Sequence, residues 1–174
     1  MSKPQPPKPN WFAANKHELL HVVRTTVAAV ASLLIGRLFR LPESYWAAIT
    51  TIVVMQSTLG AAWTISKQRL IGTAIGATVG GVVATYASAN ALAFGVGIFV
   101  GGILCLLLHV ERNAYRYTGI TVAIVVLIAR TSPAWKIALH RFAEISIGIA
   151  VALALTAIWP EDSTPPVNTF TQAR

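Results

Sequence analysis

Charged side chains are scarce in this sequence, and acidic ones are the scarcest. Charged residues make up 11% of the 174 positions, and six of them are acidic. A soluble domain carries about 25% charged residues, so this chain cannot cover a water-facing surface in the usual way. The net charge of +8 comes from basic residues scattered between apolar runs, a pattern that argues against a nucleic-acid-binding domain. These shortages point to a membrane protein.

Cysteine is almost absent as well. Cys105 is the single cysteine and stands inside an apolar run. It cannot form an intrachain disulfide, and no metal-ligating partner lies near it in the sequence. We interpret Cys105 as a small buried hydrophobic residue, and we predict no cofactor, no metal site and no enzymatic activity.

Apolar runs are what the sequence has in quantity. Hydrophobic residues make up 55% of the chain, and the mean hydropathy is +0.62. A membrane helix needs about 20 mostly apolar residues, which predicts an all-α polytopic membrane protein with six transmembrane helices. We expect a polar, Pro-rich tail and interfacial segment over 1–18, a membrane domain over 19–160 and a polar tail over 161–174. The six predicted helices cover about 19–39, 45–63, 70–87, 91–110, 114–129 and 133–159.

The basic residues predict an orientation in the membrane. Six crossings place both termini on one side. That side carries nine Lys and Arg residues against five on the other. Because cytoplasmic loops are enriched in Lys and Arg, we expect cytoplasmic termini in a bacterial inner membrane. Lys67 and Arg69 are then interpreted as a cytoplasmic anchor at the start of the third helix, where cations can reach anionic headgroups.

Glycines recur at helical spacing in two of the runs. Gly72, Gly76 and Gly80 share one helix face, and Gly97 with Gly101 forms a second such pair. Small residues let membrane helices approach closely, so we interpret these positions as packing surfaces and expect the third and fourth helices to pack face to face. The alternative is that the missing side chains leave room for a substrate path.

Part of the sequence recurs at an interval of 71 or 72 residues. Arg69 is followed by Ile75-Gly76, and Arg141 is followed at the same offsets by Ile147-Gly148. Two units of three helices would insert with opposite orientation, as in transporters built from inverted repeats. The alternative is a chance match between apolar segments of similar composition.

Polar groups inside the apolar runs are candidates for a substrate or proton pathway. Arg141 and Glu144 are one turn apart, and Glu144 is the acid placed well inside a run. An intramembrane carboxylate suggests a proton-coupling site, whereas the plainer interpretation is an ion pair that fixes helix packing. Hydroxyl and amide side chains could bind a substrate or bond neighbouring helices; these are Thr50, Thr51, Gln56 and Thr121.

The pentapeptide HELLH, His17 to His21, matches a zinc-protease motif. On a helix the two histidines share a face, and Glu18 could act as the base. Catalytic zinc needs a third protein ligand, and the sequence offers none clearly. A membrane zinc protease therefore stays a remote alternative, and we interpret the segment as a polar interface that leads into the first helix.

The stretch from Trp46 to Gly81, WAAITTIVVMQSTLGAAWTISKQRLIGTAIGATVGG, resembles the membrane part of fusaric acid resistance proteins and aromatic acid exporters. A second block resembles the last helix of that family. The residues that carry the resemblance are Trp46, Met55-Gln56, Gly60, Lys67, Arg69, Gly72-Thr73 and Ile75-Gly76, then Arg141, Glu144, Ile147-Gly148 and Trp159-Pro160.

This resemblance implies a proton-driven exporter of aromatic carboxylates and related small organic anions, with plant malate-type anion channels as distant relatives. The implied partners are the lipid bilayer, the anion, a second copy of the chain in a homodimer and a periplasmic adaptor subunit. Longer members carry a soluble domain and a second half, whereas this chain stops soon after Pro160. A non-transporting subunit that assists assembly of a larger exporter is therefore the alternative.

Overall fold

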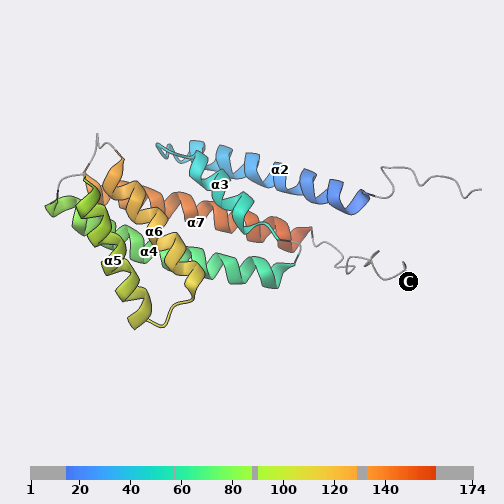
Figure 1. Ribbon diagram of the computed structural model, residues 1–174. Helices are drawn as coiled ribbons and strands as arrows, with labels where there is room; N and C mark the ends of the chain where they lie inside the picture. The colour runs from blue at the N-terminus through green and yellow to red at the C-terminus, as the bar shows by residue number, and fades with distance from the viewer. Residues whose placement is uncertain (1–14, 57, 88–89, 129–132, 160–174) are drawn as a thin grey trace, which may run out of the picture.

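The computed structural model describes residues 15–56, 58–87, 90–128 and 133–159 (Figure 1). All the regular secondary structure in these ranges is α-helical, and there are six helices. They are α2 (Lys16–Leu38), α3 (Tyr45–Val54), α4 (Leu59–Tyr86), α5 (Ala91–Leu107), α6 (Arg112–Leu127) and α7 (Ala134–Ile158). The all-α architecture therefore agrees with the prediction.

The long helices α4 and α7 pack against each other and join the two sides of the bundle. Helices α2 and α3 pack on α7, and α5 and α6 pack on α4. Figure 1 shows the first pair on one side and the second pair on the other. The packing of the two halves corresponds: α2 and α3 pack on each other and on α7, just as α5 and α6 pack on each other and on α4.

The boundary between α3 and α4 differs from the prediction. Helix α3 ends at Val54, and Met55 has an extended backbone with φ −60° and ψ 118°. Helix α4 then begins at Leu59, where the side chain of Thr58 caps it by accepting a hydrogen bond from the Ala61 backbone N–H. The expected helix over 45–63 is wrong because averaged hydropathy cannot register a short polar break flanked by apolar residues.

This boundary moves Arg69 from a helix end to a helix interior. Arg69 lies ten residues after Leu59 in the 28-residue helix α4, which is about 15 Å of helix at about 1.5 Å per residue. The predicted start of this helix at Leu70 was late because Lys67, Gln68 and Arg69 interrupt the apolar run.

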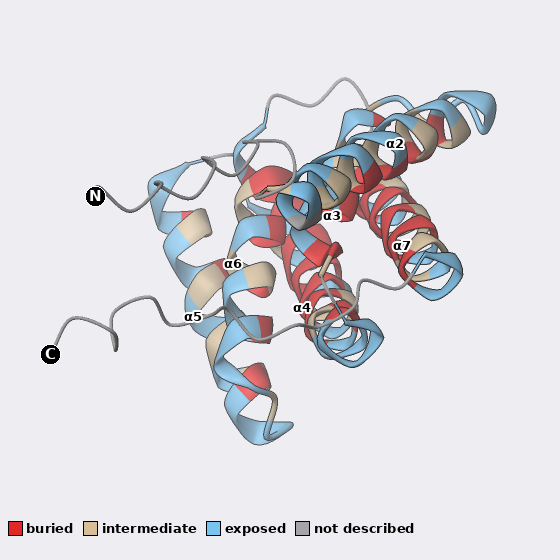
Figure 2. Ribbon diagram, turned by 90° about the vertical axis from the view of Figure 1, so that its right-hand side faces the viewer, coloured by how far each residue is buried: buried red, intermediate tan, exposed pale blue. Residues whose placement is uncertain are grey.

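Burial is concentrated in α4 and α7, whereas α2 and α5 turn large apolar side chains outward (Figure 2). Among those outward side chains, Leu34 is 56% exposed and Phe99 is 70% exposed. By length and composition, Glu18–Leu38 of α2 and all of α7 could each cross a membrane, while α3 and α5 are apolar but shorter. An apolar outer surface on helices is the arrangement that lipid requires.

The glycines of α4 mark its close approach to α6. A Cβ atom at Gly76 would lie 2.6 Å from the Thr118 carbonyl oxygen and 2.7 Å from Thr121 Cβ, and one at Gly80 would lie 3.0 Å from Val125 Cβ. Gly72 is crowded in the same way by the Ala114 carbonyl. At Gly72 and Gly76 glycine is required by space, because any side chain would push the two backbones apart, whereas at Gly80 the contact is tight but first involves the Val125 side chain.

The glycines of α5 also face α6. A Cβ at Gly97 would lie 2.8 Å from Val122 Cγ1, and one at Gly101 would lie 2.9 Å from Thr118 Cγ2. The expected direct packing of the two glycine faces against each other is therefore wrong. Both glycine faces meet α6 instead: the side chains of Thr118 and Val122 lie against the α5 glycines, and the backbone of the same two residues lies against Gly76 and Gly80.

Helices α2 and α5 end in the same way. The backbone N–H of Leu41 bonds the Gly36 carbonyl oxygen, and that of Val110 bonds the Cys105 carbonyl oxygen. The residue before each donor has a left-handed backbone: φ is 53° at Arg40 and 51° at His109. This is the Schellman motif, in which a 6→1 bond satisfies a terminal carbonyl.

Candidate functional site

Among the described residues, three arginines are buried in the bundle. Arg24 is 1% exposed, Arg69 is 5% exposed and Arg141 is 2% exposed. Removing a guanidinium from water costs several kcal/mol unless other groups replace its hydration. What each arginine contacts therefore indicates why it is there.

Arg24 ties together the carboxyl ends of two helices. Its Nη1 donates to the Trp159 carbonyl oxygen at 2.7 Å, at the end of α7, and its Nη2 donates to the Gln56 carbonyl oxygen at 2.6 Å, just after α3. The terminal carbonyls of a helix carry partial negative charge and attract cations. The Arg24 side chain points into the bundle, and not toward the membrane surface, because these carbonyls bind it.

Arg141 is neutralised by two carboxylates. It forms an ion pair with Glu43, and its Nη1 donates to Glu144 Oε2 at 3.2 Å. The other oxygen of Glu144 accepts the Glu43 backbone N–H at 3.0 Å. The guanidinium carbon also lies 4.3 Å from the centroid of the Trp46 ring, a cation–π geometry. This network joins α7 to the start of α3.

Arg69 has a different environment. Its Nε and Nη2 donate to Thr50 Oγ1 at 3.3 and 3.1 Å, and its Cζ lies 5.0 Å from the centroid of the Tyr117 ring. Within the described ranges, no carboxylate forms an ion pair with it. The assignment of Arg69 as a cytoplasmic anchor is wrong, because the side chain is directed between helices; Lys67 is exposed and stays a predicted anchor.

The two arginine–aromatic contacts occupy matching places in the chain. Arg141 follows Arg69 by 72 residues, and Tyr117 follows Trp46 by 71. A third correspondence involves the glycines. A Cβ atom added at Gly148 of α7 would meet the Ala47 carbonyl and would lie 2.7 Å from Thr50 Cβ. Gly76 is crowded in the same way by Thr118 and Thr121.

A narrow cavity lies beside Arg69 and is shared by four helices. Trp46 lines it from α3, so this ring contacts Arg141 and also borders the space next to Arg69. The Trp46 Nε1 is buried and has no hydrogen-bond partner in the described part of the chain. The cavity has room for about one water molecule, and its walls are Trp46, Arg69, Thr73, Tyr117, Ile120, Thr121, Ile124 and Ile145.

The other predicted pathway residues lie at different places. Thr51 Oγ1 donates to the carbonyl oxygens of Ala47 and Gly148, each at 3.0 Å, and so joins α3 to α7. Thr121 lines the cavity, but its hydroxyl donates to the Tyr117 carbonyl oxygen at 2.9 Å. Gln56 lies at the far end of α3, where Arg24 binds its carbonyl oxygen.

Sequence reasoning missed Trp46, Tyr117 and Glu43 as site residues. Neither aromatic ring belongs to the predicted pathway, because that prediction rests on charged, hydroxyl and amide side chains. The signal that could have found the two aromatics is the repeat interval, since Trp46 and Tyr117 are 71 residues apart and the two arginines are 72 residues apart. Trp63, Trp135 and Trp159 are exposed near helix ends, where interfacial tryptophans are common.

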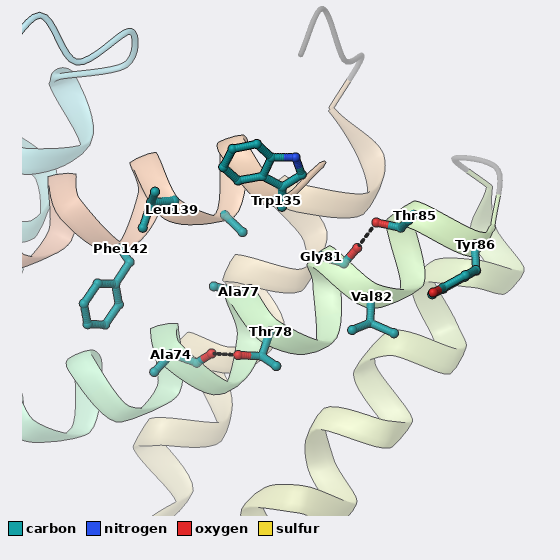
Figure 3. A pocket seen from close by; sticks show the side chains of 11 residues that line it. Ala74, Ala77, Thr78, Gly81, Val82, Thr85, Tyr86, Trp135, Leu139 and Phe142 are labelled. Atoms are coloured by element: carbon teal, nitrogen blue, oxygen red, sulfur yellow. Dashed lines mark hydrogen bonds between the residues drawn. The ribbon is translucent and has the colours of Figure 1, made fainter. Parts of the chain in front are cut away.

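A wider hollow than the cavity beside Arg69 lies elsewhere, between α4 and α7 (Figure 3). Its volume is about 580 Å³, and its walls are apolar or small, with Trp135, Leu139 and Phe142 on one side. The hydroxyls of Thr78 and Thr85 donate to carbonyls of their own helix, at 2.9 and 2.7 Å. No charged residue lines this groove, so it lacks the chemistry to select an anion.

The HELLH motif begins at His17, whose side chain lies outside the described residues. His21 Nε2 lies 3.5 Å from Thr25 Oγ1. In the portion of the chain that the structure describes, no three His, Cys, Asp or Glu side chains gather as metal ligands would. The zinc-protease hypothesis thus has no observation in its favour.

Residues 28–155 match the family described as fusaric acid resistance protein-like. The chain belongs to this family. The match spans α3 to α6, the last 11 of the 23 residues of α2 and most of α7, and so includes Arg69, Arg141 and their aromatic partners. The sequence resemblance to this family is therefore confirmed.

Two bacterial proteins illustrate the relationship. YdhK of Salmonella typhimurium, described as an uncharacterized transporter, is 28% identical over 162 residues, which are 88% of this chain and 24% of that protein. YeeA of Escherichia coli, described as an inner membrane protein, is 30% identical over 151 residues, 83% of this chain and 42% of that protein. The chain thus spans less than half the length of each relative. No solved structure matches it.

Proposed function

We propose that this chain is a transport unit for small organic anions, including aromatic carboxylates, in the bacterial inner membrane. Its family and the description of YdhK as a transporter support transport, and the description of YeeA supports the location. The observation that carries the anion assignment is Arg69, a buried cation for which the described chain supplies only a hydroxyl and a ring.

The environment of Arg69 suits an anion that must bind and then leave. A guanidinium offers five donors in a planar fork that matches a carboxylate, and burial among apolar helices strengthens the attraction compared with water. The threonine hydroxyl and tyrosine ring stabilise the cation without cancelling its charge. A permanent carboxylate partner would compete with the transported anion, as Glu43 would at Arg141.

We also propose that α2–α4 and α5–α7 are inverted repeats that alternate around this site. Three observations support the proposal. The helices of the two halves pack in corresponding ways, each half has a matching arginine–aromatic pair, and α2 and α5 end with the same hydrogen-bond pattern. In transporters of this type, one repeat rocks against the other around a site near the middle of the membrane.

Flux through reconstituted vesicles tests the transport function. Vesicles that contain the purified protein should take up radiolabelled benzoate faster than protein-free vesicles, and an imposed pH gradient should accelerate uptake further. Cells that express the chain should also tolerate higher aromatic-acid concentrations. Equal flux with and without the protein, together with equal tolerance, contradicts transport by this chain alone.

Proton coupling is assigned to Glu144, which contacts both Arg141 and the Glu43 backbone. Protonation would remove its charge and weaken its bond to Arg141. We therefore expect Glu144→Gln to retain uptake driven by a benzoate gradient but to lose the acceleration by a pH gradient. If the variant responds to pH as the wild type does, Glu144 is a packing residue only.

A second candidate is supported by YdhK and YeeA, in each of which the matched segment is less than half of a longer protein. The chain would then act as one part of a larger transporter, with a second copy in a homodimer or with a partner such as a periplasmic adaptor. Cross-linking in native membranes distinguishes the two. A stable hetero-complex, with flux that appears after the partner is added, favours the larger assembly.

A further inference from the structure

Arg141 illustrates what a guanidinium at this position in the bundle binds. It lies on an aromatic ring, and its free edge receives the carboxylate of Glu43, which comes from the loop between α2 and α3. A second carboxylate, Glu144, comes from its own helix. The combination of ring face and carboxylate neutralises a cation that is 2% exposed.

The corresponding carboxylates are missing at Arg69. Glu111 precedes α6 as Glu43 precedes α3, but its carboxylate receives the side-chain amide of Gln68. The position 72 residues before Glu144 is Gly72, where α6 leaves no space for a side chain. Arg69 therefore keeps the aromatic partner of the arrangement but neither of the two carboxylates.

We infer that the Arg69 guanidinium is the binding position for the carboxylate of the transported anion, and that Glu43 on Arg141 is its intramolecular counterpart. The inference rests on the proposed transport function and gives that function its site. The carboxylate would take hydrogen bonds from the edge of the guanidinium above Tyr117. The body of the ligand would lie against Trp46, Ile124 and Ile145, which line the adjoining cavity.

The cavity is so narrow that binding of an aromatic anion requires a conformational change. Room for about one water molecule accommodates a carboxylate oxygen but no ring, so this conformation is occluded around Arg69. A ring can enter only if α3 and α6 separate, and Trp46 is the side chain that must move first. Because Trp46 also lies on Arg141, its movement would loosen the contact that neutralises the matching arginine.

The fluorescence of Trp46 reports directly on this event. We propose a variant in which the other four tryptophans are phenylalanine, purified in detergent and titrated with benzoate. The expected result is a saturable change in emission. Benzyl alcohol has the same ring without the charge, and it should require at least about tenfold higher concentration, because hydrogen bonds to a charged group contribute about 1.5–3 kcal/mol.

Arg69→Gln in this background should weaken benzoate binding by at least about tenfold, on the same energetic grounds. Lys67→Gln is the matched control, because it removes an exposed cation two residues away on the same helix and should leave affinity within about twofold. Arg69→Lys keeps the charge without the fork and should give intermediate affinity. Tyr117→Leu, which leaves Arg69 intact, should also weaken binding.

Equal benzoate affinity in wild type, Arg69→Gln and Tyr117→Leu overturns the inference, and so does the absence of saturable binding. If sodium chloride displaces benzoate at equal concentration, the site selects charge alone and the carboxylate assignment is overturned. Flux that persists unchanged in a folded Arg69→Gln variant removes this site and leaves the proposed function standing. If the wild type binds benzoate but shows no flux, and Arg69→Gln does not bind benzoate, the site is supported and the transport function is contradicted.

Discussion

Gly148 and Gly72 show how a single missing methyl group determines the distance between two helices. An added Cβ at Gly148 would meet the Ala47 carbonyl of α3, and one at Gly72 would meet the Ala114 carbonyl of α6. Backbone at this distance cannot yield as a flexible side chain would. Gly119 differs, because no atom lies within 4 Å of a Cβ at that position.

Gly148→Ala is therefore expected to destabilise the protein, by about 1–3 kcal/mol if it behaves like other overpacked sites. The reason is the forced separation of α3 and α7, which also carries Thr50 away from Arg69. Thermal unfolding in detergent, followed by helical circular dichroism, provides the measurement. Gly119→Ala is the control and should unfold at or above the wild-type temperature. Equal unfolding temperatures for both variants would show that α3 and α7 tolerate the methyl group.

At the scale of the element, the ends of α2 and α5 share one geometry. Both place a residue other than glycine in the left-handed region, Arg40 and His109, and both side chains are exposed. For such residues this backbone conformation costs roughly 1–2 kcal/mol relative to the right-handed one. Each motif starts the return of the chain toward α3 or α6, so the fold retains the strain.

Arg40→Gly and His109→Gly should each raise the unfolding temperature, because glycine adopts this conformation freely. The gain is expected to be about 0.5–1 kcal/mol, reduced from the full strain by the greater freedom of glycine in the unfolded chain. Arg37→Gly is the matched control: it lies in the last turn of α2 and should lower stability by about 1 kcal/mol. A drop in unfolding temperature for both loop variants would show that the left-handed backbone is not strained.

At the scale of the whole molecule, burial changes how the basic residues bear on orientation. Arg24, Arg69 and Arg141 are inside the bundle, so they carry no information about the loops. Of the remaining eleven Lys and Arg residues, seven fall on the side predicted to be cytoplasmic and four on the other. The bias keeps its direction, and cytoplasmic termini stay a prediction.

Cysteine labelling tests this orientation. In a Cys105→Ala background, single cysteines at Lys16 and His109 should react with an impermeant maleimide from the cytoplasmic side. Cysteines at Arg40 and Pro133 should react from the opposite side, because alternate connections of a six-helix bundle face opposite sides. All four positions are exposed.

A cysteine at Val126, which is fully buried, should resist labelling until the protein is denatured. Labelling of Lys16 and Arg40 variants from the same side would contradict a membrane-crossing α2. If the Lys16 and Arg40 positions react from opposite sides but the His109 position reacts from the same side as Arg40, the inverted arrangement of the two halves is contradicted.

Local chemistry was readable in the sequence wherever it depended on neighbours along the chain. The apolar runs predict helices because a chain in lipid must satisfy its own backbone hydrogen bonds. The Arg141–Glu144 contact follows from residues three apart on a helix, and the glycine spacing indicates a face reserved for another backbone. The end of α3 at Val54 and the new start at Leu59 were missed, since hydropathy averages over a short polar interruption.

The sequence by itself determined the helical class and the family, because both are carried by residue types and their order. Tertiary structure alone decided which groups contact each buried arginine. Arg24 meets carbonyls more than 100 positions apart in the chain, Arg141 meets a loop carboxylate, and Arg69 meets a hydroxyl and a ring. Which partner reaches a cation depends on how helices pack, and it is this packing that leaves Arg69 without an acid among the described residues.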